Sequence, residues 1–180
     1  MARFFDALTD EQARFIAAQP VFFVASAAPE GRINLSPKGM DTFRVLTPTL
    51  VAYADLSGSG AETAAHLRAD GRLTVMFTSF GDAPLILRLY GQGRYEAPDG
   101  RAARAHPGAL PTDLPGVRGV VAMDVTSVQT SCGYAVPKMT LAAERDTLNR
   151  WAERKGPAGL RDYQSENNAV SIDGLPTGLA

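Results

Sequence analysis

The sequence predicts a mainly β domain, a small antiparallel barrel with peripheral helices. Six or seven runs rich in β-branched, aliphatic and aromatic residues follow one another through short turns, which favours antiparallel pairing. A few short helices and one terminal helix are too few for a doubly wound sheet or a bundle. Because no internal repeat or clear linker interrupts the pattern, we expect one domain over residues 1–180, with its core at 20–130 and a C-terminal helix and tail at 138–180.

Local signals place the elements of the first half. Thr9 and Gln12 have the spacing of a capping box, and Pro20 ends the helix that follows. Turn residues at 29–31 separate the first two strands, and Gly58 to Gly60 break the β pattern. The expected elements are a helix at 10–18 and strands at 21–26, 32–36, 42–46 and 50–55.

Similar local signals place the elements of the second half of the chain, where the expected strands are longer. Gly91 and Gly93, within one strand, predict a bulge or sharp coil. Asp146 and Arg150 are spaced to support the terminal helix, and we expect loop over 156–180. The expected elements are helices at 61–69, 99–105 and 138–154 and strands at 72–78, 85–96 and 117–129.

Composition excludes several classes of protein. The chain has 180 residues, 45% apolar and 21% charged, with a net charge of −1, so it has neither the composition of a disordered chain nor a basic stripe for nucleic acid. Cys132 is the only cysteine, which rules out an intrachain disulfide and a Cys-based zinc site. With no secretory signal and no membrane-length apolar run, we expect a soluble cytoplasmic protein without a metal, a nucleic-acid partner or a membrane partner.

A polar loop at 57–63 is the first candidate binding site. Ser57, Gly58, Ser59 and Gly60 precede a predicted helix, and Thr63 lies within its first turn. Glycines let backbone N–H groups approach a ligand, and a helix N-terminus favours an anion. The loop is no P-loop, and Ser59 with Glu62 also fits an ordinary capping box, so both interpretations remain open.

A second candidate is the corner formed by Ser36, Pro37, Lys38 and Gly39. Proline restricts the turn and glycine permits a positive φ, so the lysine, one of only three in the chain, is held on a constrained corner. It is either a cation for a phosphate or a solvated lysine in an ordinary turn. Two such loops beside neighbouring strands favour one phosphate between them.

Other polar residues are weaker candidates. Arg44 and Arg88 lie among apolar residues of two strands, where each either faces solvent or pairs with an anion such as Asp55. Cys132 has no histidine nearby in sequence, so we expect a buried structural thiol. His66 is expected at the surface or in packing. No catalytic residue can be named.

The order of these motifs resembles the pyridoxamine 5′-phosphate oxidase-like family of FMN-binding split barrels. The stretches that carry the resemblance are VFFVASAAPEGRINLSPKGMDTFRVLTPTLVAYADLSGSGAETAAHLRADGRLTVMF and LILRLYGQGR, from about 20 to 96. SCGYAVPKMTLAAERDTLNRW and 168–176 also resemble one branch of that family, and this likeness brings no known substrate. The implied fold is a split β-barrel with antiparallel, Greek-key-like connections.

The resemblance implies a site as well as a fold. It implies that Lys38 and the 57–63 loop hold the FMN phosphate, with Arg44 or Arg88 as further cations, and that Tyr53, Ala54 and Asp55 run along the flavin. It also implies a homodimer with FMN in the groove between two barrels. The oxidases carry an Arg-Lys pair where this chain has Gly58-Ser59-Gly60, and their pyridoxamine phosphate ligands have no match here. Vitamin B6 oxidase activity is therefore not expected.

The resulting hypothesis is an FMN-dependent oxidoreductase acting on an unknown small substrate. In this family the flavin carries the redox chemistry, which agrees with the missing acid–base constellation. The alternatives are a non-catalytic flavin or tetrapyrrole carrier, a reductase that uses the deazaflavin F420 on the same fold, and a flavin-free interaction domain.

Overall fold

The computed structural model describes residues 2–179 and places all its strands in one antiparallel sheet. The mainly antiparallel prediction is therefore confirmed. In chain order the elements are β1 (Arg3–Phe5), α1 (Asp10–Ala17), β2 (Phe22–Ser26), β3 (Asn34–Lys38), β4 (Phe43–Thr47), β5 (Leu50–Leu56), α2 (Glu62–Ala69), β6 (Arg72–Thr78), β7 (Ile86–Glu96), α3 (Arg101–Ala105), β8 (Val117–Ser131) and α4 (Thr147–Asn167).

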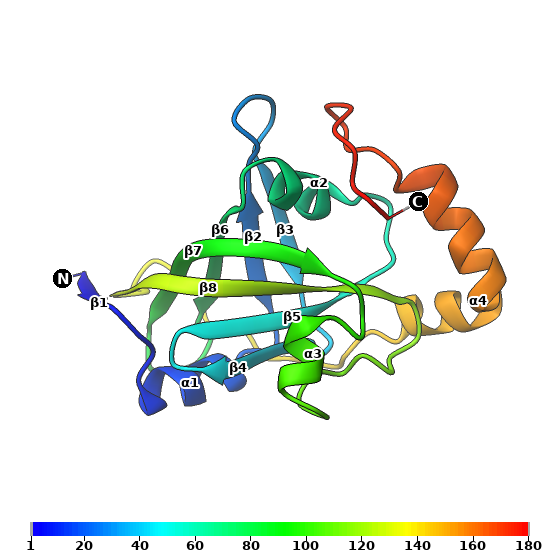
Figure 1. Ribbon diagram of the computed structural model, residues 1–180. Coiled ribbons are helices and arrows are strands. Elements are labelled where there is room, and N and C mark those ends of the chain that lie inside the picture. Colours follow the sequence, from blue (N-terminus) through cyan, green and yellow to red (C-terminus); the bar gives the residue numbers. More distant parts are fainter. Residues whose placement is uncertain (1, 180) are drawn as a thin grey trace.

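The sheet curls into an open barrel (Figure 1). Its strand order is β3-β2-β6-β7-β8-β5-β4, with β1 added along β8. Although β3 and β4 stand at opposite ends of this order, only residues 39–42 join them, a link that can span at most about 18 Å. The rings of Phe22 and Phe43 accordingly lie 5.0 Å apart across the gap. The two edges therefore lie close together without pairing among the described residues.

Two apolar clusters hold the barrel. The larger one fills its interior with side chains that alternate along the strands, as the sequence pattern predicts. A smaller cluster lies on the outer face of β5 and β8, where Ala52, Val120 and Ala122 contact Ala102 of α3 and Leu110. Because α3 covers this face, β5 is buried on both sides.

Gly91 confirms the predicted bulge in β7. The register between β7 and β8 shifts between Tyr90 and Gly91. A Cβ atom at Gly91 would lie 2.0 Å from the carbonyl oxygen of Asp124, so only glycine permits the strands to approach this closely.

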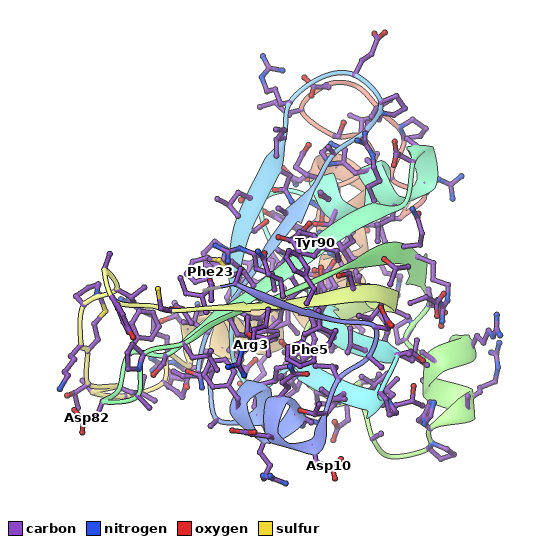
Figure 2. All side chains as sticks on the ribbon, turned by 90° about the vertical axis from the view of Figure 1, so that its left-hand side faces the viewer. Arg3, Phe5, Asp10, Phe23, Asp82 and Tyr90 are labelled. Carbon is purple, nitrogen blue, oxygen red and sulfur yellow. The ribbon has the colours of Figure 1, made fainter. Side chains whose placement is uncertain are left out.

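Two strand predictions need correction. The second strand was predicted at 32–36 but runs over Asn34–Lys38. It starts later because the N–H of Arg32 donates to the carboxylate of Asp173 instead of joining the sheet. It also continues through the predicted corner at 36–39, because Ser36, Pro37 and Lys38 pair with β2, and the positive φ angles fall at Met40 and Asp41 rather than at Gly39. β1 was not predicted, since three residues are too short to show alternation. Figure 2 shows Arg3 and Phe5 on this strand, above α1 with Asp10.

The terminal helix was also misplaced. It was predicted at 138–154 but runs over Thr147–Asn167, so the prediction of loop from 156 onwards is wrong up to Asn167. Residues before 147 are held by other contacts: the N–H of Met139 donates to the carbonyl of Phe80 at 3.0 Å, and Lys138 pairs with Asp82. Figure 2 shows Asp82 projecting from the loop between β6 and β7. Tertiary contacts therefore override the helical propensity of this segment.

Two smaller findings complete the fold. Cys132 is exposed, contrary to prediction, because β8 ends one residue before it. The predicted Asp146–Arg150 pair is confirmed at 2.6 Å. Within the described part of the chain, no helix is both long and apolar enough to span a bilayer.

Candidate functional site

The two candidate segments, now seen as strand β3 and the loop after β5, meet at a cavity of about 290 Å³. It is framed by β3, the end of β5, the connection at 57–61, the first turn of α2 and the start of β8. The predicted site residues that line it are Ser36, Lys38, Asp55, Gly58, Ser59, Gly60 and Thr63. Segments separated by some twenty residues in the sequence thus face one small space, hereafter the anion cavity.

Other predicted site residues lie outside the anion cavity. Tyr53 and Ala54 are buried in β5, and Pro37 pairs with Phe23 in the sheet. Ser57 and Gly39 line a neighbouring, larger cavity. The roles predicted for these residues toward a flavin stay predictions.

The predicted arginines Arg44 and Arg88 also lie elsewhere. Arg44 pairs with Asp41 at 2.9 Å, and its Nε donates to the carbonyl of Ala109 at 3.1 Å. Arg88 donates to Ser131 Oγ at 3.3 Å. Arg44 thus pairs with a carboxylate, one of the two alternatives, but neither arginine pairs with Asp55, the partner suggested for them.

Asp55 is a buried carboxylate with three donors. Lys38 Nζ lies 3.2 Å from Oδ1, while Arg118 Nε and the Tyr95 hydroxyl donate to Oδ2 at 2.8 and 3.1 Å. Burial raises the pKa of Asp55, but the charges of Lys38 and Arg118 outweigh it, so the pKa lies below its ordinary value. Asp55 therefore stays ionised and holds both cations at the cavity.

Arg118 is the functional candidate that sequence reasoning missed. Its side chain is only 3% exposed, and besides Asp55 it donates to the Asn168 side-chain oxygen and to the carbonyl of Gly60, each at 2.8 Å. The criterion applied to Arg44 and Arg88, a charge within an apolar strand, also selects this residue in the run VRGVVAM. Its place beside Asp55 follows from the pairing of β5 with β8, which sets Asp55 opposite Gly119.

The N-terminus of α2 is open toward the anion cavity. The predicted Ser59–Glu62 capping box is wrong: Ala61 occupies the N-cap position, and no described side chain caps it. The Glu62 carboxylate instead accepts the N–H of Ile172 at 3.0 Å. First-turn N–H groups of an eight-residue helix therefore remain available at a positive helix pole.

A polar network supports one wall of the anion cavity. The Asn34 amide donates to Ser26 Oγ at 3.2 Å and to Thr63 Oγ1 at 3.1 Å, and it accepts from Ser36 Oγ at 3.0 Å. His66 Nδ1 lies 3.0 Å from Ser26 Oγ, so this histidine is a packing residue, one of the two predicted roles. The network fixes the polar atoms of β3 and α2 relative to each other.

Two buried polar atoms beside this region have no partner among the described residues, the Tyr53 hydroxyl and His66 Nε2. Burial, and after it the charge of Asp55, raises the pKa of Tyr53 far above its ordinary value. Its hydroxyl therefore stays protonated.

A larger cavity of about 1270 Å³ adjoins the anion cavity, and Gly58 and Ser59 line both. One wall is aromatic: the rings of Trp151 and Tyr163, both from α4, lie 5.0 Å apart, edge to face. Lys155 lies over both rings. The remaining apolar lining includes Val21, Met40, Phe80, Met139, Leu141 and Leu148. A ligand with an anionic end and a flat apolar body fits the two cavities together.

Comparison with known proteins identifies the family. A family model described as pyridoxamine 5′-phosphate oxidase matches residues 8–131. The ustO protein of Aspergillus flavus, a pyridoxamine 5′-phosphate oxidase family protein, is 41% identical over 193 residues, covering 98% of this chain and 78% of that protein. This chain belongs to the pyridoxamine 5′-phosphate oxidase family.

Solved structures agree with this family membership at the level of fold. HupZ of group A Streptococcus, crystallised as a variant, is 18% identical, with a TM-score of 0.51 over 68% of this chain and 98% of that chain. A candidate pyridoxamine 5′-phosphate oxidase from Lactobacillus delbrueckii is also 18% identical, with a TM-score of 0.52 over 69% of this chain and 94% of that chain. These likenesses confirm the predicted fold class.

The pyridoxamine 5′-phosphate oxidase match divides the site into two parts. Every residue that lines the anion cavity lies within residues 8–131. In contrast, α4 and the segment before it, which supply much of the larger cavity, lie beyond the match. The matched region and the segment beyond it therefore both contribute to the larger cavity.

Proposed function

We propose that this chain binds FMN and is a flavin-dependent oxidoreductase acting on a small substrate. The observation that carries the proposal is the anion cavity, where the uncapped N-terminus of α2 meets Lys38 and Arg118. Helix N–H groups combined with a fixed ammonium and guanidinium are a recurring means of holding a phosphate.

The anion cavity can hold a phosphate even though two carboxylates balance its two cations. Lys38 and Arg118 face two carboxylates, Asp55 and Glu62, so the formal charge of the lining is balanced. Both carboxylates are already engaged, Asp55 by the two cations and Glu62 by the N–H of Ile172. An ammonium group has three donors and Asp55 occupies one of them, which leaves N–H groups for a ligand.

The larger cavity supports a flavin rather than a bare phosphate. It continues from the anion cavity at Gly58 and Ser59, and its apolar and aromatic lining suits a planar ring system. The small volume of the anion cavity favours the single phosphate of FMN over a dinucleotide.

The flavin, when bound, supplies two-electron redox chemistry. The chain's own residues bind the phosphate, orient the ring and exclude water from it. Tyr53 and Tyr95 keep their protons, since burial, and after it the charge of Asp55, raises the pKa of each. Neither tyrosine is therefore expected to act as an acid or a base near neutral pH.

We further propose that the functional unit is a homodimer. Met139 and Leu141 line the larger cavity, yet they are 61% and 57% exposed. Apolar side chains of this size are ordinarily buried, and a second copy lying over them would cover the cavity.

Cofactor extraction tests the function directly. The purified protein is expected to be yellow, and the cofactor released by heat to co-elute with FMN. Lys38→Ala is expected to raise the FMN dissociation constant at least about tenfold, because it removes a charge-assisted contact. Ser59→Ala should weaken binding less, and Lys138→Ala, at an exposed lysine paired with Asp82, is the matched control.

Two outcomes would count against this function. A colourless protein that stays free of flavin after incubation with FMN contradicts it outright. A protein that holds FMN but shows no turnover with NAD(P)H and any electron acceptor is a flavin carrier.

A further inference from the structure

We propose that Asn168 is a positioning residue for the anion cavity, through which the C-terminal segment, residues 168–177, holds Arg118 and the Gly58–Gly60 connection in place. The effect on FMN rests on the function proposed above. The effect on the connection itself does not depend on FMN.

Asn168 bridges two walls of the cavity. It has no exposed surface; its Nδ2 donates to the carbonyl of Gly58 at 3.1 Å, and its Oδ1 accepts from Arg118 Nη1 at 2.8 Å. Only this orientation of the amide works, because the reverse would set a donor against a guanidinium and an acceptor against a carbonyl.

The bridge continues to the predicted phosphate ligand. Arg118 Nη2 donates to the carbonyl of Gly60, and its Nε donates to Asp55, whose other oxygen holds Lys38. One asparagine beyond the end of α4 is therefore connected by hydrogen bonds to both cations and to both glycines of the connection. A connection with two glycines has little rigidity of its own, so external contacts decide where its N–H groups point.

The C-terminal segment is anchored independently of the Asn168 side chain. The N–H of Ile172 donates to Glu62, and Asp173 pairs with Arg32. Within the segment, the Thr177 hydroxyl lies 2.5 and 3.1 Å from the backbone carbonyl oxygens of Asn168 and Ala169. Figure 1 shows this segment, in red, beside α2. These contacts fix the position of the C-terminal segment, so Asn168 can hold Arg118 and the Gly58–Gly60 connection in place.

A second contact, made by Gln164, also holds the connection that follows β5. Gln164 Nε2, from the last turns of α4, donates to the fully buried Ser57 Oγ at 2.7 Å, across 107 positions of sequence. Both contacts come from beyond residue 131, where the family match ends. The C-terminal part of the chain, beyond the family match, thus contacts the connection that lines one side of the cavity.

The test compares FMN with riboflavin, which lacks the phosphate. Asn168→Ala and Asn168→Asp are expected to raise the FMN dissociation constant about tenfold and the riboflavin constant less than about twofold, since only the phosphate end is disturbed. The aspartate keeps the acceptor for Arg118 and loses the donor to Gly58, but it also adds a negative charge beside the cavity, so the uncharged Asn168→Ala decides between the outcomes. Asn167→Ala, at the exposed neighbour that bonds only within its helix, should change neither constant.

Other results would overturn the proposal or separate it from the function. Equal weakening of both flavins, or no change in either, contradicts a positioning role. If the wild type binds no flavin, the proposed function fails, and the bridge made by Asn168 is then tested by amide hydrogen exchange. Faster exchange at 58–60 in Asn168→Ala than in Asn167→Ala supports the bridge. Equal exchange in the two variants refutes it. Should Asn168→Ala not fold, Gln164→Ala, at a less buried position, is expected to shift both readouts in the same direction.

Discussion

Asp55 shows how one buried charge organises the site. It receives hydrogen bonds from Lys38, Arg118 and Tyr95, which come from three different strands. A buried carboxylate with this many donors stays ionised, and removing one partner of such a cluster leaves the others uncompensated. The residue is thus more important for holding the cations than for contacting a ligand.

We therefore expect Asp55→Asn to lower the free energy of unfolding by about 3 kcal/mol at neutral pH, because it leaves Lys38 and Arg118 without their buried carboxylate partner. The pKa of Asp55 is lowered in the folded state, so its contribution is complete above the unfolded pKa, near ~3.9, and is lost as the pH falls through the folded value. The difference between wild type and variant should shrink below about pH 4.

Urea titration at several pH values measures this difference. Asp82→Asn, at a carboxylate whose side chain is 94% exposed, serves as the control and should change stability little. A loss for Asp55→Asn that is the same at pH 3 as at pH 7 would contradict the assignment.

At the scale of elements, α4 is two helical pieces joined at a kink. Gly156, with φ +66° and ψ 173°, adopts a conformation that other residues avoid, and Pro157 begins the second piece. The kink places Trp151 of the first piece edge to face with Tyr163 of the second. The aromatic wall of the larger cavity therefore depends on one glycine.

Replacing the glycines of α4 separates this role from ordinary helix propensity. Gly156→Ala is expected to lower the free energy of unfolding by about 1–3 kcal/mol, through backbone strain alone, since a Cβ there meets open space. Gly159→Ala, inside the second helical piece, should be neutral or stabilising by up to about 1 kcal/mol. Chemical denaturation of both variants checks this, and equal effects at the two positions would mean that α4 is not kinked at Gly156.

At the scale of the whole molecule, the site is built where distant parts of the chain return to one place. The barrel brings β3, β5 and β8 to the anion cavity, and the C-terminal segment reaches the same place from more than 100 positions away. The larger cavity still carries exposed apolar side chains, which the proposed second copy would cover.

The homodimer predicts a mass in solution of twice 19.1 kDa, measurable by light scattering after gel filtration. Leu141→Lys is expected to produce monomers and to lose FMN together with the partner. Phe4→Lys, 66% exposed on β1, at the edge of the molecule away from α4 in Figure 1, should remain a dimer. A wild-type protein of 19.1 kDa would contradict the proposal.

Much of the fold was predictable because its signals are local. The Thr9–Gln12 capping box forms as its spacing predicts, and the bulge at Gly91 follows from a residue type. Most strands were found from their apolar patterns, and both segments that line the anion cavity were found from glycine, proline and hydroxyl residues, although Ser36–Lys38 was predicted as a turn and lies in β3. Such features involve partners a few residues away or a backbone preference of one residue, so they can be recognised along the chain.

The partners of the charged groups were not predictable in this way. Asp55 pairs with Arg118 rather than Arg44 or Arg88, and Arg118 in turn meets Asn168. Each of these contacts joins residues 50 or more positions apart, and strand pairing and the returning C-terminus decide which side chains meet. The order and type of elements therefore follow from short-range preferences along the chain, whereas the composition of the anion cavity follows from long-range contacts that exist only once the sheet has curled around its core.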